Sequence, residues 1–366
     1  MESKKIIILG GARDYHVVDW YKAIKGIAPD REIILVTDTY ESEGLKNVAD
    51  DEVVTESLFV IDRLLFVKQS KLSNIWRNLL KLSLLPLQSY KLRKFHKKHD
   101  GNVIYHAMPM YYMMLCWFSG YSFIGTPQGS EILVRPNRSM LYKFMAKLIL
   151  RSASTVTVDS ESMRKGIQKI SQADAKVIQN GIDLDLIDSY NKVQKNTKRD
   201  KVVSLRAMTS LYNISTILKQ RNQVESSSVL QFIYPFFDDA YLNNVKTLLQ
   251  EGDQMIGRLD KPAMYQLLSE SFAIISIPSS DSSPRSVYEA IFLGCAVITV
   301  YNQWLDVLPV CMKSRVVVID PESENWFDNA IKNAQEITQK SYLPSDEAIN
   351  MFDENVSLRR VVDELY

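Results

Sequence analysis

The sequence has few of the residues that mark disulfide-rich, metal-binding or membrane-spanning proteins. It contains three cysteines and four histidines in 366 residues. Cys116, Cys295 and Cys311 are far apart and lie in apolar runs, so we expect buried free thiols in a reducing compartment. The longest apolar stretch, residues 107–118, is shorter than the ~20 residues that a membrane-spanning helix needs.

A strong charge imbalance and a leader peptide are also missing. The formal net charge is +1 at pH 7, which gives no global reason to expect a nucleic-acid partner. The chain enters an apolar run at Ile6 without the pattern of a signal peptide, which favours a cytoplasmic location. Hydrophobic residues make up 46% and charged residues 24%, as in ordinary globular proteins. The length favours two domains.

Short apolar runs alternate with helical spacing along the whole chain, a pattern typical of parallel α/β sheets. The polar stretch 188–201 separates two halves and has the composition of a linker. We therefore predict two doubly wound α/β domains. The predicted strands are 5–9, 32–37, 102–106, 122–126 and 155–158 in the first half, and 202–205, 229–234, 254–256, 272–277, 296–300 and 316–319 in the second.

The most informative stretch is 272–299, which predicts a strand, a polar turn, a helix and a second strand. Pro284 suits the first helical position, Ser283 suits the N-cap before it, and Gly294 suits the C-terminal end. Free N–H groups near Arg285 and Ser286 would then face a ligand. Such a helix N-terminus is a favourable site for a phosphate group.

Two carboxylates flank this helix N-terminus. Asp281 precedes the helix, and Glu289 lies about two turns into it. Amides suit a diphosphate, whereas carboxylates suit the hydroxyls of ribose and of a sugar, so the pattern indicates a sugar-nucleotide site. The alternative is an ordinary strand–turn–helix unit in which Asp281 only caps the turn.

Two further residues come at the ends of predicted strands, where α/β sheets bind ligands. Arg206 follows the strand 202–205 and could bind a diphosphate oxygen, or it could be a surface arginine. His106 ends the strand 102–106 and could orient an acceptor hydroxyl or bind phosphate, or it could be a structural histidine.

Gly10 and Gly11 follow the first strand. They lack the third glycine of a dinucleotide-binding fingerprint, so we expect either a tight turn or a backbone that approaches a donor phosphate or acceptor. Asp183 and Asp185 form an Asp-x-Asp pattern, which we interpret as a helix start and not as a metal site.

Residues 63–99 differ from the rest because basic and apolar residues alternate there without one Asp or Glu. Such a stretch can lie on an anionic membrane surface, at ~1 kcal/mol for each basic residue near that surface. The alternative is a pair of ordinary helices with solvated charged faces. We expect no nucleic-acid binding, since aromatic platforms and a groove-sized basic face are missing.

The run Ser-Asp-Ser-Ser-Pro-Arg-Ser-Val-Tyr-Glu-Ala-Ile-Phe-Leu-Gly-Cys-Ala-Val-Ile resembles the carboxylate–seven-residues–carboxylate signature of retaining glycosyltransferases of family 4. Asp281 stands where many members carry glutamate, and Glu289 fills the second acidic position. In most members a lysine follows the arginine at position 206, whereas this chain has Tyr212 and Asn213 in that region.

Other landmarks of that family occur in the same order along the chain. His16 heads the first predicted helix after the glycines, and Val-Ile-Tyr-His-Ala-Met contains His106. Gly129-Ser130-Glu131 is similar to a loop on the acceptor side, and Ile256-Gly257-Arg258 to the segment that reads the nucleobase. The C-terminal residues resemble the helix that returns to the first domain.

The resemblance implies the GT-B fold, in which two Rossmann-like domains face a cleft. It implies an acceptor-side domain over 1–188, joined by the C-terminal helix 348–366, and a donor-binding domain over 200–347. It also implies metal-independent, retaining transfer from a nucleoside-diphosphate sugar, with UDP-sugar favoured over GDP-sugar and no further cofactor. The expected acceptor is a glycan or lipid-linked glycan of bacterial surface polysaccharide synthesis, at the inner face of the cell membrane.

The resemblance also assigns roles to individual residues. The catalytic residues would be Arg206, Asp281, Glu289 and His106; donor binding would involve Gly10, Gly11, Arg206, Gly257, Arg258, Asp281, Pro284, Arg285, Ser286 and Glu289; the acceptor side would hold His16, His106, Gly129, Ser130 and Glu131. Two alternatives stay open. One is a nucleotide-sugar epimerase of the same architecture, and the other is a non-catalytic partner subunit that binds nucleotide weakly.

Overall fold

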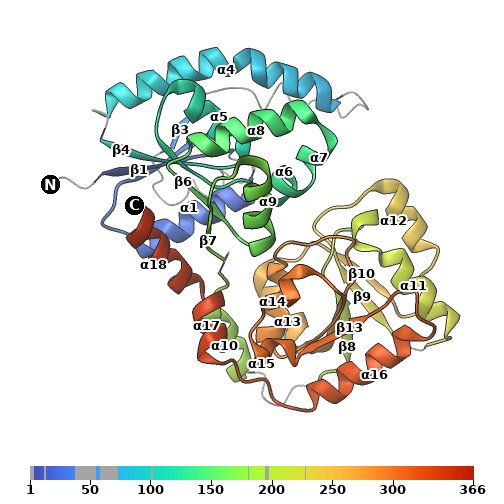
Figure 1. Ribbon diagram of the computed structural model, residues 1–366. Coiled ribbons are helices and arrows are strands. Elements are labelled where there is room, and N and C mark those ends of the chain that lie inside the picture. The colour runs from blue at the N-terminus through green and yellow to red at the C-terminus, as the bar shows by residue number, and fades with distance from the viewer. Residues whose placement is uncertain are drawn as a thin grey trace. The chain divides into compact units, whose positions relative to one another are not determined.

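The computed structural model describes residues 4–11, 14–37, 55–57, 73–99, 102–179, 181–193, 198–226 and 228–366 (Figure 1). They form two compact units. The N-terminal unit comprises Met1–Gln179 with Leu358–Tyr366, and the C-terminal unit comprises Asn180–Ser357.

The N-terminal unit is built on a parallel sheet with the strand order β3-β2-β1-β4-β5-β6-β7. The five strands predicted for this half are confirmed within two residues at each end. β3 and β7 were not predicted, because β3 has the sequence Thr-Glu-Ser without an apolar run and β7 is only two residues long. The strands are β1 (Lys5–Leu9), β2 (Ile33–Thr37), β3 (Thr55–Ser57), β4 (Val103–Ala107), β5 (Phe123–Gly125), β6 (Thr155–Val158) and β7 (Lys176–Val177).

Helices cover both faces of this sheet, so successive side chains of β1 are buried alternately in one core and the other. Ile7 and Leu9 join one core with the helices α4, α5, α8 and α9, while Ile6 and Ile8 join a second core with α1 and α18. The helices of this unit are α1 (Tyr15–Ile27), α4 (Ser73–Lys98), α5 (Met110–Ser119), α6 (Gly129–Leu133), α7 (Arg135–Arg138), α8 (Met140–Ser152) and α9 (Glu161–Ser171), and α18 (Glu354–Leu365) returns to it.

The C-terminal unit has a parallel sheet with the order β10-β9-β8-β11-β12-β13. All six predicted strands are confirmed within two residues. β11 is buried along its whole length, as expected for a central strand covered on both faces. The strands are β8 (Lys201–Ser204), β9 (Leu230–Ile233), β10 (Gln254–Gly257), β11 (Ser271–Ser276), β12 (Ala296–Val300) and β13 (Val316–Ile319).

This sheet is also covered on both faces. One core contains residues of α10, α13, α14, α15 and α17, and the other contains residues of α11, α12 and α16. The helices are α10 (Leu184–Val193), α11 (Ile214–Gln223), α12 (Asp239–Lys246), α13 (Lys261–Ser269), α14 (Arg285–Phe292), α15 (Val310–Lys313), α16 (Trp326–Thr338) and α17 (Asp346–Phe352), with the short turns η1 (Ser210–Tyr212) and η2 (Gln303–Leu305).

The observed units differ from the predicted domains at both places where the chain passes from one unit to the other. Residues 180–188 and 348–357 belong to the C-terminal unit and not to the N-terminal one. Ile182 pairs with the end of α17, since its N–H donates to Phe352 O at 2.7 Å and its carbonyl accepts the N–H of Glu354 at 2.9 Å. The return to the N-terminal unit begins at Leu358, which is buried in the core beside Ile6 and Ile8.

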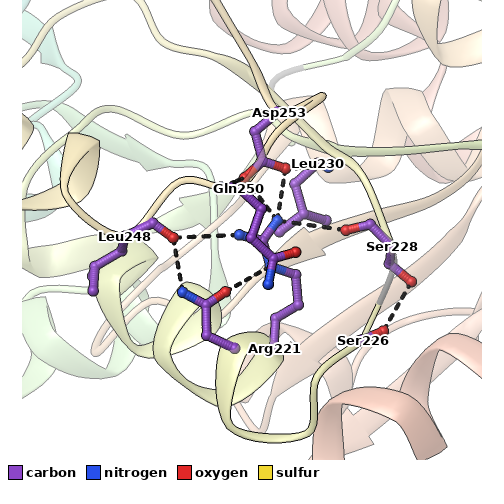
Figure 2. A network of polar contacts seen from close by, with 8 residues as sticks. Arg221, Ser226, Ser228, Leu230, Leu248, Gln250 and Asp253 are labelled. Carbon is purple, nitrogen blue, oxygen red and sulfur yellow. Dashed lines mark hydrogen bonds and ion pairs between the residues drawn. The ribbon is translucent and has the colours of Figure 1, made fainter.

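A buried polar network fixes the edge of the C-terminal sheet at which its strands begin (Figure 2). Arg221, at the end of α11, forms a fully buried ion pair with Asp253, with Nη1 at 2.6 Å and 2.7 Å from the two carboxylate oxygens. Asp253 also accepts the N–H groups of Leu230 and Gln250, each at 2.9 Å. The network therefore ties α11 to the starts of β9 and β10.

The basic stretch predicted at 63–99 lies partly outside the described residues, which begin again at Ser73. From there the described part of the stretch forms one helix, α4, of 26 residues, which contains Pro86. Within the described residues, no helix combines the length and the apolar character needed to cross a membrane.

Candidate active site

The candidate site lies at the carboxyl ends of β8 and β11, the two neighbouring strands at which the strand order of the C-terminal sheet reverses. Loops that leave such a reversal point diverge to opposite faces and open a crevice, which is where doubly wound sheets bind ligands. Arg206 lies in the loop after β8, and Asp281 lies in the loop after β11. The fold thus brings these two predicted residues together.

Three groups hold Arg206 in place. Its Nε donates to Ser276 Oγ, at the end of β11, at 2.7 Å. Its Nη2 lies 3.0 Å from Asp281 Oδ2. The guanidinium lies over the ring of Tyr212, 5.3 Å from the ring centroid. Arg206 is almost completely buried, with 9% of its surface exposed. The alternative of a surface arginine is therefore wrong.

Asp281 is the less satisfied member of this ion pair. Its backbone N–H donates to Asn302 Oδ1 at 3.2 Å, and its carboxylate accepts the amides of Ser282 and Ser283. Burial raises the pKa of the carboxyl group, although Arg206 and the two amides oppose that effect. Oδ2 is buried against Arg206 Nη2, but 15% of the Asp281 side chain stays exposed, so the carboxyl group is in part accessible to a ligand.

The helix after this loop begins one residue later than predicted. α14 starts at Arg285, and Pro284 occupies the N-cap position that was predicted for Ser283. The N–H of Arg285 donates to the carbonyl of Ser283 at 3.0 Å, so this predicted phosphate donor is already occupied. Ser286 follows in the first turn of α14.

Glu289 lies in the second turn of α14 and is almost completely buried. It accepts a hydrogen bond from the hydroxyl of Tyr265, on α13, at 2.9 Å, and Arg285 Nε lies 3.5 Å from the same oxygen. Burial raises the pKa of its carboxyl group, and Arg285 opposes that effect. Each acid of the pair spaced by seven residues therefore has its own arginine: Arg206 for Asp281 and Arg285 for Glu289.

Gly257 and Arg258 come at the carboxyl end of β10, two strands away from β8 in the sheet. Gly257 has a φ of +83°, which a side chain would strain, and the space where a Cβ would stand is open. Arg258 is exposed. Their predicted contact with a nucleobase stays a prediction.

The N-terminal unit places its predicted residues around the end of β1. A Cβ on Gly10 would lie 2.6 Å from the Val17 side chain and 2.8 Å from the Met108 carbonyl, so close packing against α1 requires this glycine. Gly11 is half-buried beside it. His16 is exposed in the first turn of α1, and its N–H donates to Asp14 Oδ1 at 3.1 Å.

His106 differs from its predicted role. The ring is fully buried in β4, Nδ1 pairs with the hydroxyl of Tyr366, and Nε2 lies 2.7 Å from Thr126 Oγ1. Burial lowers its pKa to about 3, which keeps the ring neutral. With both nitrogens occupied, His106 fits the structural alternative: it ties β4 to α18 and to the loop after β5.

Glu131 also proves to be structural. It is buried, and its carboxylate accepts the N–H of Gln128 at 3.0 Å and that of Met110 at 2.9 Å. It thereby caps α6 and fixes the first residue of α5. Gly129 opens α6, and Ser130 beside it is exposed.

Sequence reasoning missed two residues of the site, Ser276 and Tyr265. Ser276 had a usable signal, because it lies near the end of the predicted apolar strand 272–277 and so stands at the ligand-binding edge. Tyr265 had none, since its contact with Glu289 joins two helices. No group of three His, Cys, Asp or Glu side chains suitable for a metal ion occurs within the part of the chain that the structure describes.

Comparisons with known proteins support the architecture. Neither the protein-family models nor the curated proteins searched give a match. Among solved structures, the chain is similar to HepE from Anabaena in complex with UDP, with a TM-score of 0.74, 16% identity and 99% of each chain covered. It is also similar to sucrose-phosphate synthase from Thermosynechococcus elongatus, with a TM-score of 0.70, 15% identity and 98% of each chain covered.

A glycosyltransferase from Rickettsia africae is similar as well, with a TM-score of 0.67, 15% identity, 99% of this chain covered and 98% of that chain. These neighbours share the GT-B architecture, and the likeness extends over almost the whole of each chain. Both sheets of the present chain have the strand arrangement that this architecture requires. The predicted GT-B fold, composed of two doubly wound domains, is therefore confirmed.

Proposed function

We propose that the chain is a retaining, metal-independent glycosyltransferase that uses a nucleoside-diphosphate sugar. The observation that carries this proposal is the Arg206–Asp281 pair at the reversal point of the C-terminal sheet. It combines an oriented, largely buried cation with a carboxylate, and both side chains keep part of their surface exposed. A diphosphate needs the cation, and a sugar hydroxyl needs the acceptor.

In this proposal the residues of the site act on different parts of the donor. Arg206 and the first turn of α14, including Ser286, bind the diphosphate. Glu289 accepts from the ribose hydroxyls, and Asp281 accepts from the donor sugar. Gly257 and Arg258 contact the nucleobase.

The proposed reaction breaks the bond between the anomeric carbon and the diphosphate oxygen. A bond from the acceptor oxygen to the same face of that carbon replaces it. The electron pair of the broken bond stays on the diphosphate, which also takes the proton of the acceptor hydroxyl. Arg206 stabilises the charge that develops on this leaving group. The products are the glycosylated acceptor and the nucleoside diphosphate.

UDP-sugar is the donor that we favour. Structures of Anabaena HepE in complex with UDP, with UDP and glucose, and with UDP-glucose are all similar to this chain over 99% of its length. At 12–16% identity the likeness shows fold alone, so the donor is a proposal that rests on the site geometry together with these complexes.

For the acceptor we propose a glycan or lipid-linked glycan of bacterial surface polysaccharide synthesis, handled at the cytoplasmic face of the membrane. His16, Gly129 and Ser130 remain the candidates on the acceptor side, and Gly10 and Gly11 remain candidates for donor binding. His106 and Glu131 are not carried forward, because their polar atoms are used inside the N-terminal unit. Membership of glycosyltransferase family 4 is part of the same proposal.

Incubation with radiolabelled UDP-sugars, with and without an acceptor extract, tests this function. A transferase releases UDP and labels an acceptor, an epimerase interconverts free donor sugars, and a non-catalytic subunit leaves the donor unchanged. Arg206→Ala should abolish label transfer, whereas Lys219→Ala, at an exposed position on α11, should not. Interconversion without acceptor would overturn the proposal in favour of an epimerase.

A further inference from the structure

The charge of the chain is distributed very unevenly. Residues 63–158 contain fifteen lysines and arginines but only two carboxylates, Asp100 and Glu131, a net charge of +13. The whole chain has a net charge of +1, so the remainder carries −12. This segment includes α4, α5, α7 and α8, which pack on one another in the order α4, α5, α8, α7. A near-neutral protein therefore has one strongly basic region.

The first part of this basic region is α4, which lies outside α5 (Figure 1). Its inner side contributes Leu85, Leu92 and Phe95 to the core. Its outer side is apolar over the first described turns and basic over the last ones. The exposed apolar residues are Leu79, Leu82, Leu87 and Tyr90, and the exposed cations that follow include Arg93, Lys94 and Lys97.

The second part is the junction of α7 and α8, which sequence analysis did not single out. Met140, Leu141 and Phe144 form the first turn and a half of α8 and are 79%, 74% and 58% exposed. Arg138 and Lys143 are exposed beside them. Met140, Leu141 and Phe144 follow one another on one helix, and a group of exposed apolar side chains marks a candidate interaction surface.

Both parts combine exposed apolar side chains with cations and lack exposed carboxylates in the described residues. α4 and α8 also contribute to the same core, on one face of the N-terminal sheet. Cations attract anionic lipid headgroups, and apolar side chains enter the boundary below those headgroups. Nucleic acid would match the charge, but it would not bury aliphatic side chains such as Met140 and Leu141.

We propose that the outer face of α4 and the α7–α8 junction form one membrane-binding surface. The cations of α4 bind anionic headgroups, and Met140, Leu141 and Phe144 enter the headgroup boundary. Charge attraction and insertion of apolar side chains are both needed, because stable attachment of a peripheral protein takes two such contributions. This surface belongs to the N-terminal unit and the proposed donor site to the C-terminal unit, so the proposal does not depend on the donor site.

Co-sedimentation of the full chain with lipid vesicles tests the proposal. The probes are vesicles of phosphatidylcholine alone and of phosphatidylcholine with 30% phosphatidylglycerol, at low salt and at 0.5 M salt. We expect binding to the anionic vesicles only, weakened by salt. The triple variant R93E/K94E/K97E should lower the partition coefficient by about fivefold or more for each cation. The matched control K219E/K246E/K332E changes three exposed lysines of the C-terminal unit and should bind like the wild type.

The insertion step is tested by M140S/L141S/F144S, which should bind at least about tenfold more weakly at both salt concentrations. Val310→Ser with Leu343→Ser removes exposed apolar side chains from the C-terminal unit and should have no effect. All five positions are exposed, so an unchanged melting temperature will show that the variants fold. Absence of binding to anionic vesicles would overturn the proposal, as would binding by R93E/K94E/K97E and M140S/L141S/F144S that equals wild-type binding. If single-stranded RNA displaces the protein from the vesicles, the partner of this surface is nucleic acid and not a membrane.

Discussion

The C-terminal unit contains two buried arginine–aspartate pairs at opposite edges of one sheet. Arg221 and Asp253 lie at the edge where the strands begin, and both side chains are fully buried. Arg206 and Asp281 lie at the edge where the strands end, and their side chains are 10% and 15% exposed. The first pair is surrounded by hydrogen-bond partners of the protein (Figure 2), whereas the second is held by Ser276 and Tyr212 and stays partly exposed.

This comparison distinguishes a structural pair from a pair that we propose binds a ligand, and it uses no similarity to other proteins. A buried pair that is enclosed by protein hydrogen bonds has no capacity left for a ligand, and loss of one member would leave an uncompensated buried charge, so we interpret Arg221 and Asp253 as a structural pair. A partly exposed pair can exchange a protein contact for a ligand contact, which is the role that we propose for Arg206 and Asp281. Four predictions test this distinction.

The largest effect is expected for Asp253→Ala. Removal of one member of a fully buried pair leaves Arg221 without its counter-charge, which should lower the free energy of unfolding by about 3–5 kcal/mol. Urea denaturation measures the loss, and UDP affinity of the folded variant should stay at the wild-type value. The double variant R221M/D253L should be more stable than Asp253→Ala, because it leaves no buried charge. Equal stability of the two variants would contradict this interpretation.

Arg206→Ala should have the next largest effect, on binding instead of folding. Hydrogen bonds to charged groups contribute about 1.5–3 kcal/mol, so the Kd for UDP should rise about 10- to 100-fold. Isothermal titration calorimetry measures this change. Arg206→Lys should restore part of the affinity if the charge matters, while uridine, which has no phosphate, should bind all three proteins alike. Equal loss of uridine binding would indicate a distorted fold.

Glu289→Gln should weaken UDP binding by about tenfold, since a neutral amide is a poorer acceptor for ribose hydroxyls than a carboxylate. Stability should not fall, because the pKa of Glu289 is raised by burial and ionisation therefore opposes folding. Because the pKa of Glu289 is higher in the folded protein, the wild type loses stability as pH rises past the ordinary value of 4.5. The glutamine variant cannot ionise there and does not lose that stability. Thermal unfolding from pH 4 to pH 8 checks the sign: the variant should gain on the wild type as pH rises.

The smallest effect is expected for Asp281→Asn, within about 1 kcal/mol of the wild type in unfolding free energy. Burial raises the pKa of Asp281 above its ordinary value of 3.8, so its ionisation opposes folding at neutral pH, and removal of the charge offsets the lost ion pair with Arg206. Sugar transfer from the donor should nevertheless be lost, because the asparagine amide cannot replace both acceptor oxygens. A stability loss as large as that of Asp253→Ala would make the two pairs equivalent and remove the distinction.

The contrast also explains which parts of the site the sequence could predict. Arg206, Asp281 and Glu289 follow apolar strands or sit on a short helix, so local patterns fix their place at one edge of the sheet. His106 has the same local pattern, but its partner Tyr366 is 260 residues away, and that contact decides its role. Arg221 and Asp253 gave no signal, because only the fold brings the end of α11 to the starts of β9 and β10.

The fold itself was more accessible than the site. The strands of the C-terminal sheet are short apolar runs of the right length, so their order along the chain predicts the doubly wound topology. The bounds of the units were harder to predict, because residues 180–188 and 348–357 are assigned by the pairing of Ile182 with the end of α17. Such long-range backbone pairing leaves no trace in local composition.

The central claim is that the reversal point of the C-terminal sheet binds a nucleoside diphosphate, and thermal unfolding with UDP, GDP, ADP and CMP tests it most directly. Wild-type protein should be stabilised by UDP, by about 2.7 kcal/mol at 100 times its Kd. Arg206→Ala at the same UDP concentration should lose most of that gain. No stabilisation by any of the four nucleotides, or an equal gain in Arg206→Ala, would contradict the claim.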